Sequence, residues 1–204
     1  SHSVSLSADL YHTFGKVQTN LLVEGFYTIL DDVFALRDMD DAADGGKVKE
    51  RYNGSGATVR GFNVEGRAAF TRWFELQAGV TLQQSRYKEP EYWSEDAEVP
   101  PVRRMFRTPD AYGYFTASFK TVRNFTADLS GTCTGSMLVQ HMAGSGVGQD
   151  VAVSTPSFFD MNIRLSYDVR IYKEITMQLY GGVQNLFNAY QKDFDLSLIH
   201  ISEP

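Results

Sequence analysis

The sequence lacks the features that mark several common classes of protein. It has 204 residues but a single cysteine, Cys133, so no internal disulfide can form. No run approaches the roughly 20 consecutive apolar residues that a membrane-spanning helix needs. Acidic residues outnumber basic ones by 25 to 19, which gives no reason to expect a nucleic acid partner. These absences argue against a helical membrane protein and against a nucleic-acid-binding protein.

The sequence does contain segments in which apolar and polar side chains alternate at every second position. Only 6 prolines accompany 17 glycines, 14 phenylalanines and 11 tyrosines, a composition that favours a β-rich chain. Odd positions of one segment are apolar and even positions are polar: Phe159, Met161, Ile163, Leu165 and Tyr167 alternate with Asp160, Asn162, Arg164 and Ser166. We count about eight such segments. Long strands with one apolar and one well-hydrated face are typical of a wall between lipid and a wet interior. The sequence therefore predicts an all-β fold, part of a transmembrane antiparallel β-barrel.

The connections between these segments alternate in length. Short ones lie near residues 12–16, 71–73, 121–124 and 168–173, and long ones near residues 38–46, 87–109 and 141–156. Outer-membrane barrels have this arrangement, with short periplasmic turns and long extracellular loops. A change in the alternation near Gly61 also predicts a β-bulge or kink at that glycine.

The two ends of the chain are interpreted separately. Residues 196–204 resemble the translation of a sequencing-library adapter, so we exclude them from the fold and assign residues 1–195 to a partial barrel. The sequence begins inside a strand pattern and shows no signal peptide. We expect it to be an internal piece of a longer exported protein.

Three motifs occur in order along the chain. They are residues 53–66 (NGSGATVRGFNVEG), residues 159–167 (FDMNIRLSY) and residues 182–190 (GVQNLFNAY). Together they resemble the C-terminal barrel of TonB-dependent outer-membrane receptors, especially those of Bacteroidetes. The third is similar to the Asn-Leu-Phe-Asn signature that precedes the last strand in that family.

The resemblance implies a particular architecture and activity. The barrel would have 22 strands, enclose an N-terminal plug domain and lie in the outer membrane of a Gram-negative bacterium. Its expected partners are outer-membrane lipid, its own plug, the TonB complex, and a small-molecule or glycan ligand such as a siderophore or cobalamin. The chain departs from the family pattern because it lacks the plug, the TonB-contacting segment and an aromatic-ended final strand.

An acidic segment offers a weak candidate metal site. Asp38, Asp40, Asp41 and Asp44 have spacings that suit Ca²⁺, but the twelve-residue EF-hand pattern with its terminal Glu is not met. A solvated acidic surface loop with a glycine turn is the favoured interpretation of the segment. We expect no metal and no cofactor.

Other charged and aromatic residues are candidates for contact with substrate or plug. Glu65, Arg67, Asp160 and Arg164 fall on the polar faces of their strands, where ion pairing and solvation are alternative roles. Trp93 and Arg104 lie in a long connection rich in aromatic and cationic residues. That connection either binds an organic ligand by stacking and charge or packs on itself.

No residues suggest catalysis. There is no arrangement of a nucleophile with its base, and the glycine-rich residues 143–148 do not precede a predicted helix, as a phosphate-binding loop requires. We therefore expect a receptor or transporter and not an enzyme. A passive porin and, less favoured, a soluble β-sandwich carbohydrate-binding module remain as alternatives; a barrel enzyme such as a lipase lacks a visible nucleophile.

Overall fold

The structure is a computed structural model. It describes residues 1–31, 34–39, 48–94, 96, 98–121, 124–143 and 147–190, with only the backbone for residues 34–39 and 48–53. The prediction for Asp40, Asp41 and Asp44 and the interpretation of residues 196–204 fall outside the described residues.

Strands make up the described chain from end to end. They are β1 (His2–Phe14), β2 (Val17–Leu30), β3 (Phe34–Met39), β4 (Val48–Asn53), β5 (Ala57–Ala69), β6 (Phe74–Glu91), β7 (Val102–Arg104), β8 (Ala111–Lys120), β9 (Phe125–Thr134), β10 (Leu138–His141), β11 (Val151–Ser154), β12 (Phe158–Tyr172) and β13 (Ile175–Val183).

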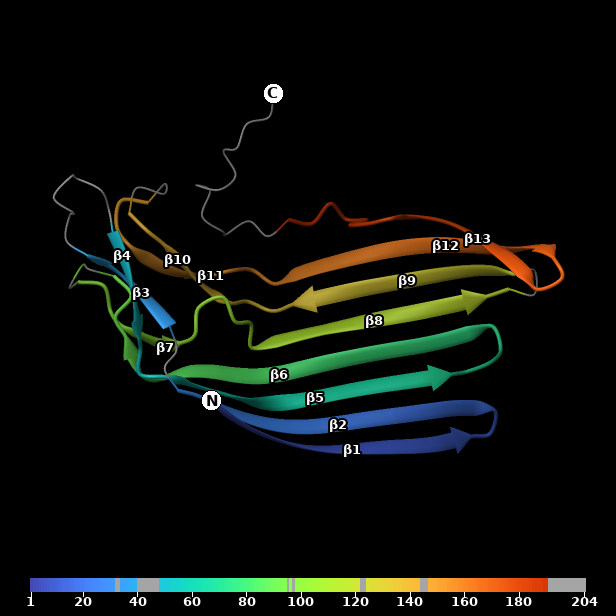
Figure 1. The fold of residues 1–204 in the computed structure, drawn as a ribbon, viewed down its shortest axis with the longest axis horizontal. Coiled ribbons are helices and arrows are strands. Elements are labelled where there is room, and N and C mark those ends of the chain that lie inside the picture. The colour runs from blue at the N-terminus through green and yellow to red at the C-terminus, as the bar shows by residue number, and fades with distance from the viewer. Residues whose placement is uncertain are drawn as a thin grey trace, which may run out of the picture.

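One large antiparallel sheet dominates the fold (Figure 1). Its strand order is β1-β2-β5-β6-β8-β9-β12-β13, with β7 added on β6. The two smaller sheets, β3-β4 and β10-β11, are hairpins within long connections. The predicted all-β antiparallel fold is confirmed. β1 and β13 lie at opposite edges of the sheet and do not pair with each other.

Long and short connections lie at opposite ends of the sheet (Figure 1). The stretches between neighbouring strands of the large sheet are short at residues 15–16, 70–73, 121–124 and 173–174 and long at residues 31–56, 92–110 and 135–157. The short turn predicted near residues 168–173 is present but is confined to residues 173–174, because Val169 and Arg170 still pair with Met177 and Thr176. We call the end that carries the long connections the cap.

The predicted bulge at Gly61 is wrong. β5 pairs with β2 and β6 through Gly61 without a shift in register. A Cβ at this position would meet the carbonyl oxygen of Leu82 and lie 2.8 Å from the ring of Phe26. The glycine therefore provides room for a neighbouring ring, and the apparent phase change arises because Val59 lies on the polar face and Arg60 on the apolar face.

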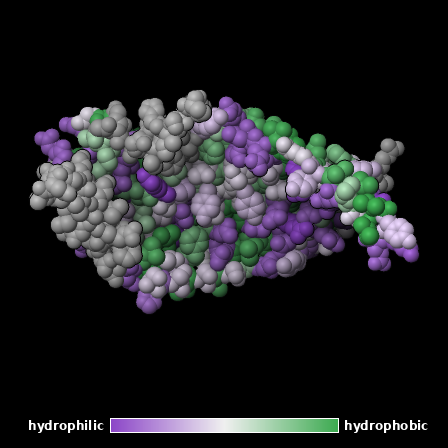
Figure 2. Space-filling model, turned by 45° about the horizontal axis from the view of Figure 1, so that its top comes forward, coloured by the Kyte–Doolittle hydropathy of each residue, from purple (hydrophilic) through white to green (hydrophobic). Residues whose placement is uncertain are grey.

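The sheet is a single layer with little core. Its apolar face is exposed: Leu6 is 82% exposed, Phe62 65% and Leu179 54%. The few fully buried side chains, such as Val139 and Thr155, lie in the cap. Figure 2 shows hydrophilic residues to the right of the centre of one face and hydrophobic residues along its upper right edge. A β-sandwich would bury the apolar face against a second sheet, and the described residues provide none.

Among the residues that the structure describes, no helix is long enough and apolar enough to cross a membrane.

Candidate functional site

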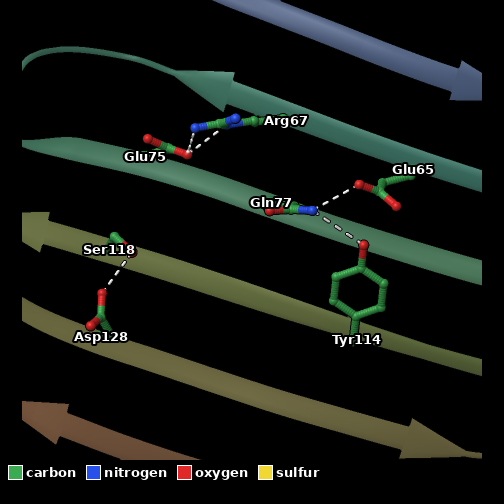
Figure 3. A network of polar contacts seen from close by, with 7 residues as sticks. All are labelled: Glu65, Arg67, Glu75, Gln77, Tyr114, Ser118 and Asp128. Carbon is green, nitrogen blue, oxygen red and sulfur yellow. Dashed lines mark hydrogen bonds and ion pairs between the residues drawn. The ribbon is translucent and has the colours of Figure 1, made fainter. Parts of the chain in front are cut away.

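The polar face of the sheet carries a network of side chains that joins four strands (Figure 3). Its members are Glu65 and Arg67 on β5, Glu75 and Gln77 on β6, Tyr114 and Ser118 on β8, and Asp128 on β9. In-register pairing places residues of one parity on one face, so these side chains are neighbours across strands.

Arg67 and Glu75 form an ion pair across the β5–β6 hairpin. The guanidinium donates from Nε to a carboxylate oxygen of Glu75 at 2.6 Å, and its Nη2 lies 2.6 Å from the same oxygen. The Glu75 side chain is 27% exposed and the Arg67 side chain 57%. Arg67 therefore neutralises the charge of Glu75 on the polar face of the sheet.

Gln77 links three strands. Its amide nitrogen donates to the carboxylate of Glu65 at 2.7 Å and to the hydroxyl of Tyr114 at 3.3 Å. On the next strand pair, the hydroxyl of Ser118 donates to Asp128 at 2.7 Å. Sequence reasoning missed Gln77, Tyr114 and Ser118. Their alternation with apolar residues was the signal, but uncharged side chains did not stand out as candidates.

Aromatic rings on one strand cover glycines on the neighbouring strand and help to hold the register of the sheet. Gly79 opposes Tyr114 in the register, and a Cβ on Gly79 would lie 2.7 Å from the Tyr114 ring. Phe26 lies over Gly61 in the same way, while Phe62 over Gly25 and Phe115 over Gly131 do so on the apolar face. An aromatic ring that covers a cross-strand glycine shields the backbone and holds the register.

Asp160 and Arg164 lie on the same face, on β12. Asp160 accepts a hydrogen bond from Asn162 at 3.1 Å, and its Oδ1 is buried without a partner among the described residues. Arg164 donates to Gln178 at 3.4 Å and lies over the Tyr180 ring, 4.7 Å from its centroid. The structure does not bring these two residues into the network of Figure 3.

The cap holds a second group of the predicted residues. Trp93 is 8% exposed and packs edge-on against Phe106, with 5.5 Å between ring centroids. Arg104 donates to the carbonyl of Ser136 at 2.7 Å and pairs with Asp110 at 3.1 Å. Trp93 and Arg104 therefore contact protein groups in the structure.

Two long connections pack together through these contacts. The hydroxyl of Ser94 donates to Asp150 at 2.6 Å, and the amide of Arg107 donates to the carbonyl of Leu138 at 2.8 Å. Between them lies a pocket of about 360 Å³ lined in part by Trp93, Asp96, Glu98 and Asp150. The cap thus combines a buried aromatic centre with an acidic rim.

Titratable groups at the cap respond to burial and pairing. Burial raises the pKa of the Tyr87 hydroxyl, and the charge of Glu91 raises it further. The hydrogen bond from Lys88 lowers the pKa of Asp31, and the two groups are 2.8 Å apart. This ion pair connects the end of β2 to β6.

No metal site is evident where the structure can be described. Across those residues, no three His, Cys, Asp or Glu side chains are grouped closely enough to hold an ion. Asp38 lies in β3, where only the backbone is described.

The Asn-Leu-Phe-Asn segment forms a turn that folds back on β12. The Asn185 side chain bonds both the amide and the carbonyl of Ala189, and the Asn185 amide donates to Asn162 at 2.9 Å. Asn185 and Asn188 both have φ of 50°, a left-handed conformation that asparagine tolerates better than most residues. The role of this motif in the structure is to end β13.

Comparison with solved structures identifies the fold. The ferric-catecholate import receptor Fiu from Escherichia coli K12 matches with a TM-score of 0.58 and 17% identity over 91% of this chain and 23% of its own. The outer membrane transporter YddB from Escherichia coli matches with a TM-score of 0.55 and 13% identity over 91% of this chain and 28% of its own. No model of a known family and no curated protein sequence matches the chain.

These similarities define a class of fold. The described chain has the antiparallel architecture of outer-membrane β-barrel receptors and spans about a quarter of the length of these two structures. It forms an open part of such a wall, because its edge strands do not pair with each other.

Proposed function

We propose that the chain is part of the barrel wall of an energy-coupled nutrient receptor in the outer membrane of a Gram-negative bacterium. The observation that carries this proposal is a single-layer sheet whose exposed apolar face and hydrogen-bonded polar face are combined with long connections at one end only. The apolar face meets lipid, the polar face lines the interior, and the cap faces the medium.

The polar network suits a plugged barrel. Its charged members Glu65, Arg67, Glu75 and Asp128 are hydrogen-bonded to neighbouring strands, which fixes their positions on the interior wall. Fixed polar groups offer a preorganised surface to a folded domain inside the barrel. On this proposal, an N-terminal plug packs against the network and the TonB complex acts on that plug.

Ligand capture is assigned to the cap. Fiu is an import receptor and YddB an outer membrane transporter, and import of a scarce nutrient such as a siderophore, cobalamin or a glycan is the corresponding function here. Catalysis has no part in it, since recognition followed by release into the periplasm requires no covalent step.

The test is an uptake experiment with the complete gene that contains this chain. A deletion strain, with and without the gene on a plasmid, is grown on ferric siderophores, cobalamin or glycans as limiting nutrients, and each strain is compared with one that lacks TonB. Growth that requires both the gene and TonB supports an energy-coupled receptor. Gene-dependent growth that persists without TonB favours a passive porin, and protein found only in the soluble fraction contradicts the proposal.

A further inference from the structure

The apolar face has a groove at the point where its side chains change from apolar to basic. The groove has a volume of about 600 Å³ and crosses β1, β2, β5 and β6. Its floor is the backbone of Ser5, Phe26, Gly61 and Gln83, which are register partners. The side chains of Ser5, Phe26 and Gln83 lie on the polar face, and Gly61 has no side chain, so the groove opens on the apolar side.

The two walls of the groove differ in chemistry. The wall nearer the short turns consists of Leu6, Gly25, Phe62 and Leu82, all register partners. The wall nearer the cap consists of Val4, Tyr27, Arg60 and Gln84. Arg60 donates to the amide oxygen of Gln84 from Nε at 3.2 Å and from Nη2 at 2.8 Å. The guanidinium of Arg60 therefore lies at the edge of the apolar groove that is nearer the cap.

Two further basic residues, Arg86 and Lys88, lie on the same face between the groove and the cap. Arg86 is exposed and has no ion pair or hydrogen bond among the described residues. It is a diagonal neighbour of Arg60 across β5 and β6. Such diagonal neighbours are about 7–8 Å apart. Lys88 continues the series and pairs with Asp31 at 2.8 Å. The carboxylate that lines the groove, Asp110, pairs with Arg104 at 3.1 Å.

From this arrangement we propose that the groove and the two arginines bind a phosphate-bearing lipid of the outer leaflet, with its acyl part against Phe62 and Leu82 and its phosphate at Arg60 and Arg86. The inference rests on the proposed membrane location, which places the cap outside. On β6 the outward residues from Phe74 to Leu82 are apolar and the next ones are Gln84, Arg86 and Lys88. That change marks the level of the headgroups.

The positive charge of Arg60 and Arg86 favours an anionic lipid over a neutral one in the groove. An exposed guanidinium above an apolar band attracts anionic headgroups, at about 1 kcal/mol for each Arg or Lys. Two such residues correspond to a change of roughly thirtyfold in affinity, since 1.4 kcal/mol is tenfold. A neutral lipid would use the apolar wall alone and leave Arg60 without an anionic partner.

The experiment measures lipid binding by the complete protein that contains this chain, purified from outer membranes in mild detergent. The probe is diphosphoryl lipid A, compared with the same lipid after removal of its phosphates, and native mass spectrometry counts the bound molecules. We expect the double variant Arg60→Gln/Arg86→Gln to bind the phosphorylated lipid at least tenfold more weakly. Arg72→Gln, in a short turn at the other end of the sheet, is the matched control and should change binding less than twofold.

Three results would overturn the inference: equal binding of the dephosphorylated lipid, unchanged binding by the double variant, or equal loss in Arg72→Gln. Heat-modifiable migration in gels checks that each variant folds. If the double variant does not fold, lipid binding by the single variant Arg60→Gln is measured instead. Wild-type protein that resides in the outer membrane but binds no phosphorylated lipid overturns this inference only. Protein absent from that membrane overturns the proposed function as well.

Discussion

At the scale of single residues, the polar face is organised by pairs that sequence alternation alone did not reveal. Arg67 and Glu65 were candidates as isolated charges, yet each bonds a residue on β6, Glu75 and Gln77 respectively. The side chain that contacts another depends on the register between strands, and register is not encoded in a local pattern. Sequence could therefore predict the face on which a charge lies but not its partner.

The glycines beneath aromatic rings offer a direct test of this packing. A Cβ at Gly61 meets the backbone oxygen of Leu82 and the Phe26 ring, whereas a Cβ at Gly66 meets no atom within 4 Å. We expect Gly61→Ala to destabilise the folded barrel by about 1–3 kcal/mol through overpacking. Denaturant titration of the complete protein in detergent measures the change. Gly66→Ala on the same strand is the control, expected within about 0.5 kcal/mol, and equal effects of the two would contradict the packing argument.

The ion pair between Arg67 and Glu75 is expected to contribute little. Because Arg67 is more than half exposed, solvent screens the attraction, and a double-mutant cycle with Arg67→Gln and Glu75→Gln should give a coupling of about 0.2–1 kcal/mol. Unfolding of the four proteins under identical conditions supplies the cycle. A coupling of several kcal/mol would mean that the pair is far less hydrated than its exposure indicates.

Protonation of Asp31 should loosen the cap. Its pKa is lowered in the folded state by Lys88, so the stabilisation that this pair contributes is present above the unfolded pKa of about 3.9 and is lost as the pH falls through the lower folded pKa. The amide of Lys88 bonds the carbonyl of Gly56 at 3.0 Å and reports the change by hydrogen exchange, corrected for its intrinsic pH dependence. Asp31→Asn should show the faster exchange already at neutral pH; unaltered exchange in this variant would contradict the argument.

At the scale of elements, the cap is one packed unit made from two connections. Trp93 and Phe106 come from residues 92–110, and Val139 and Thr155 come from residues 135–157. The amide of Met137 donates to the Thr155 hydroxyl at 3.1 Å, and the amide of Thr155 donates back to the Met137 carbonyl at 2.8 Å. Periodicity identified neither β7 nor the β10–β11 hairpin, because such short strands show too few alternations to recognise.

Loss of Trp93 should therefore affect both connections together. Trp93→Ala removes a ring that is 8% exposed and packs on Phe106, at a cost of about 3–5 kcal/mol for a buried Trp. We expect faster hydrogen exchange in residues 98–107 and 138–141 at once, with unchanged exchange in β5 and β6. Tyr92→Ala is the control, because Tyr92 is 74% exposed. An effect confined to residues 98–107 would show that the two connections are independent.

At the scale of the whole molecule, the two faces of the sheet require different surroundings. Val23 lies on the apolar face and Glu24, the next residue along β2, lies on the polar face. The alternation was readable from sequence over long stretches, and so was the separation of long from short connections. The exact extent of β12 was not readable, since Asp168 and Arg170 resemble turn residues although both pair with β13.

A charge placed on either face distinguishes lipid from water. Val23→Arg should destabilise the barrel in lipid vesicles by about 2–4 kcal/mol near the midplane. Glu24→Arg, one residue away, should change stability by less than about 1 kcal/mol because its side chain faces the hydrated interior. Denaturant titration in vesicles measures both variants. Equal tolerance of the two substitutions would contradict the assignment of the apolar face to lipid.

The unbroken register of the sheet from β1 through β12 has a consequence for how such a chain can vary. Each strand between the two edges, from β2 to β12, is hydrogen-bonded on both sides to antiparallel partners. One residue inserted into β5 would exchange its inward and outward side chains, while two would restore the faces and merely slide the pairing. Insertions of an odd number of residues are therefore disfavoured within the strands, whereas the connections at the cap accept insertions of any length. Related chains should differ in length mainly in those connections.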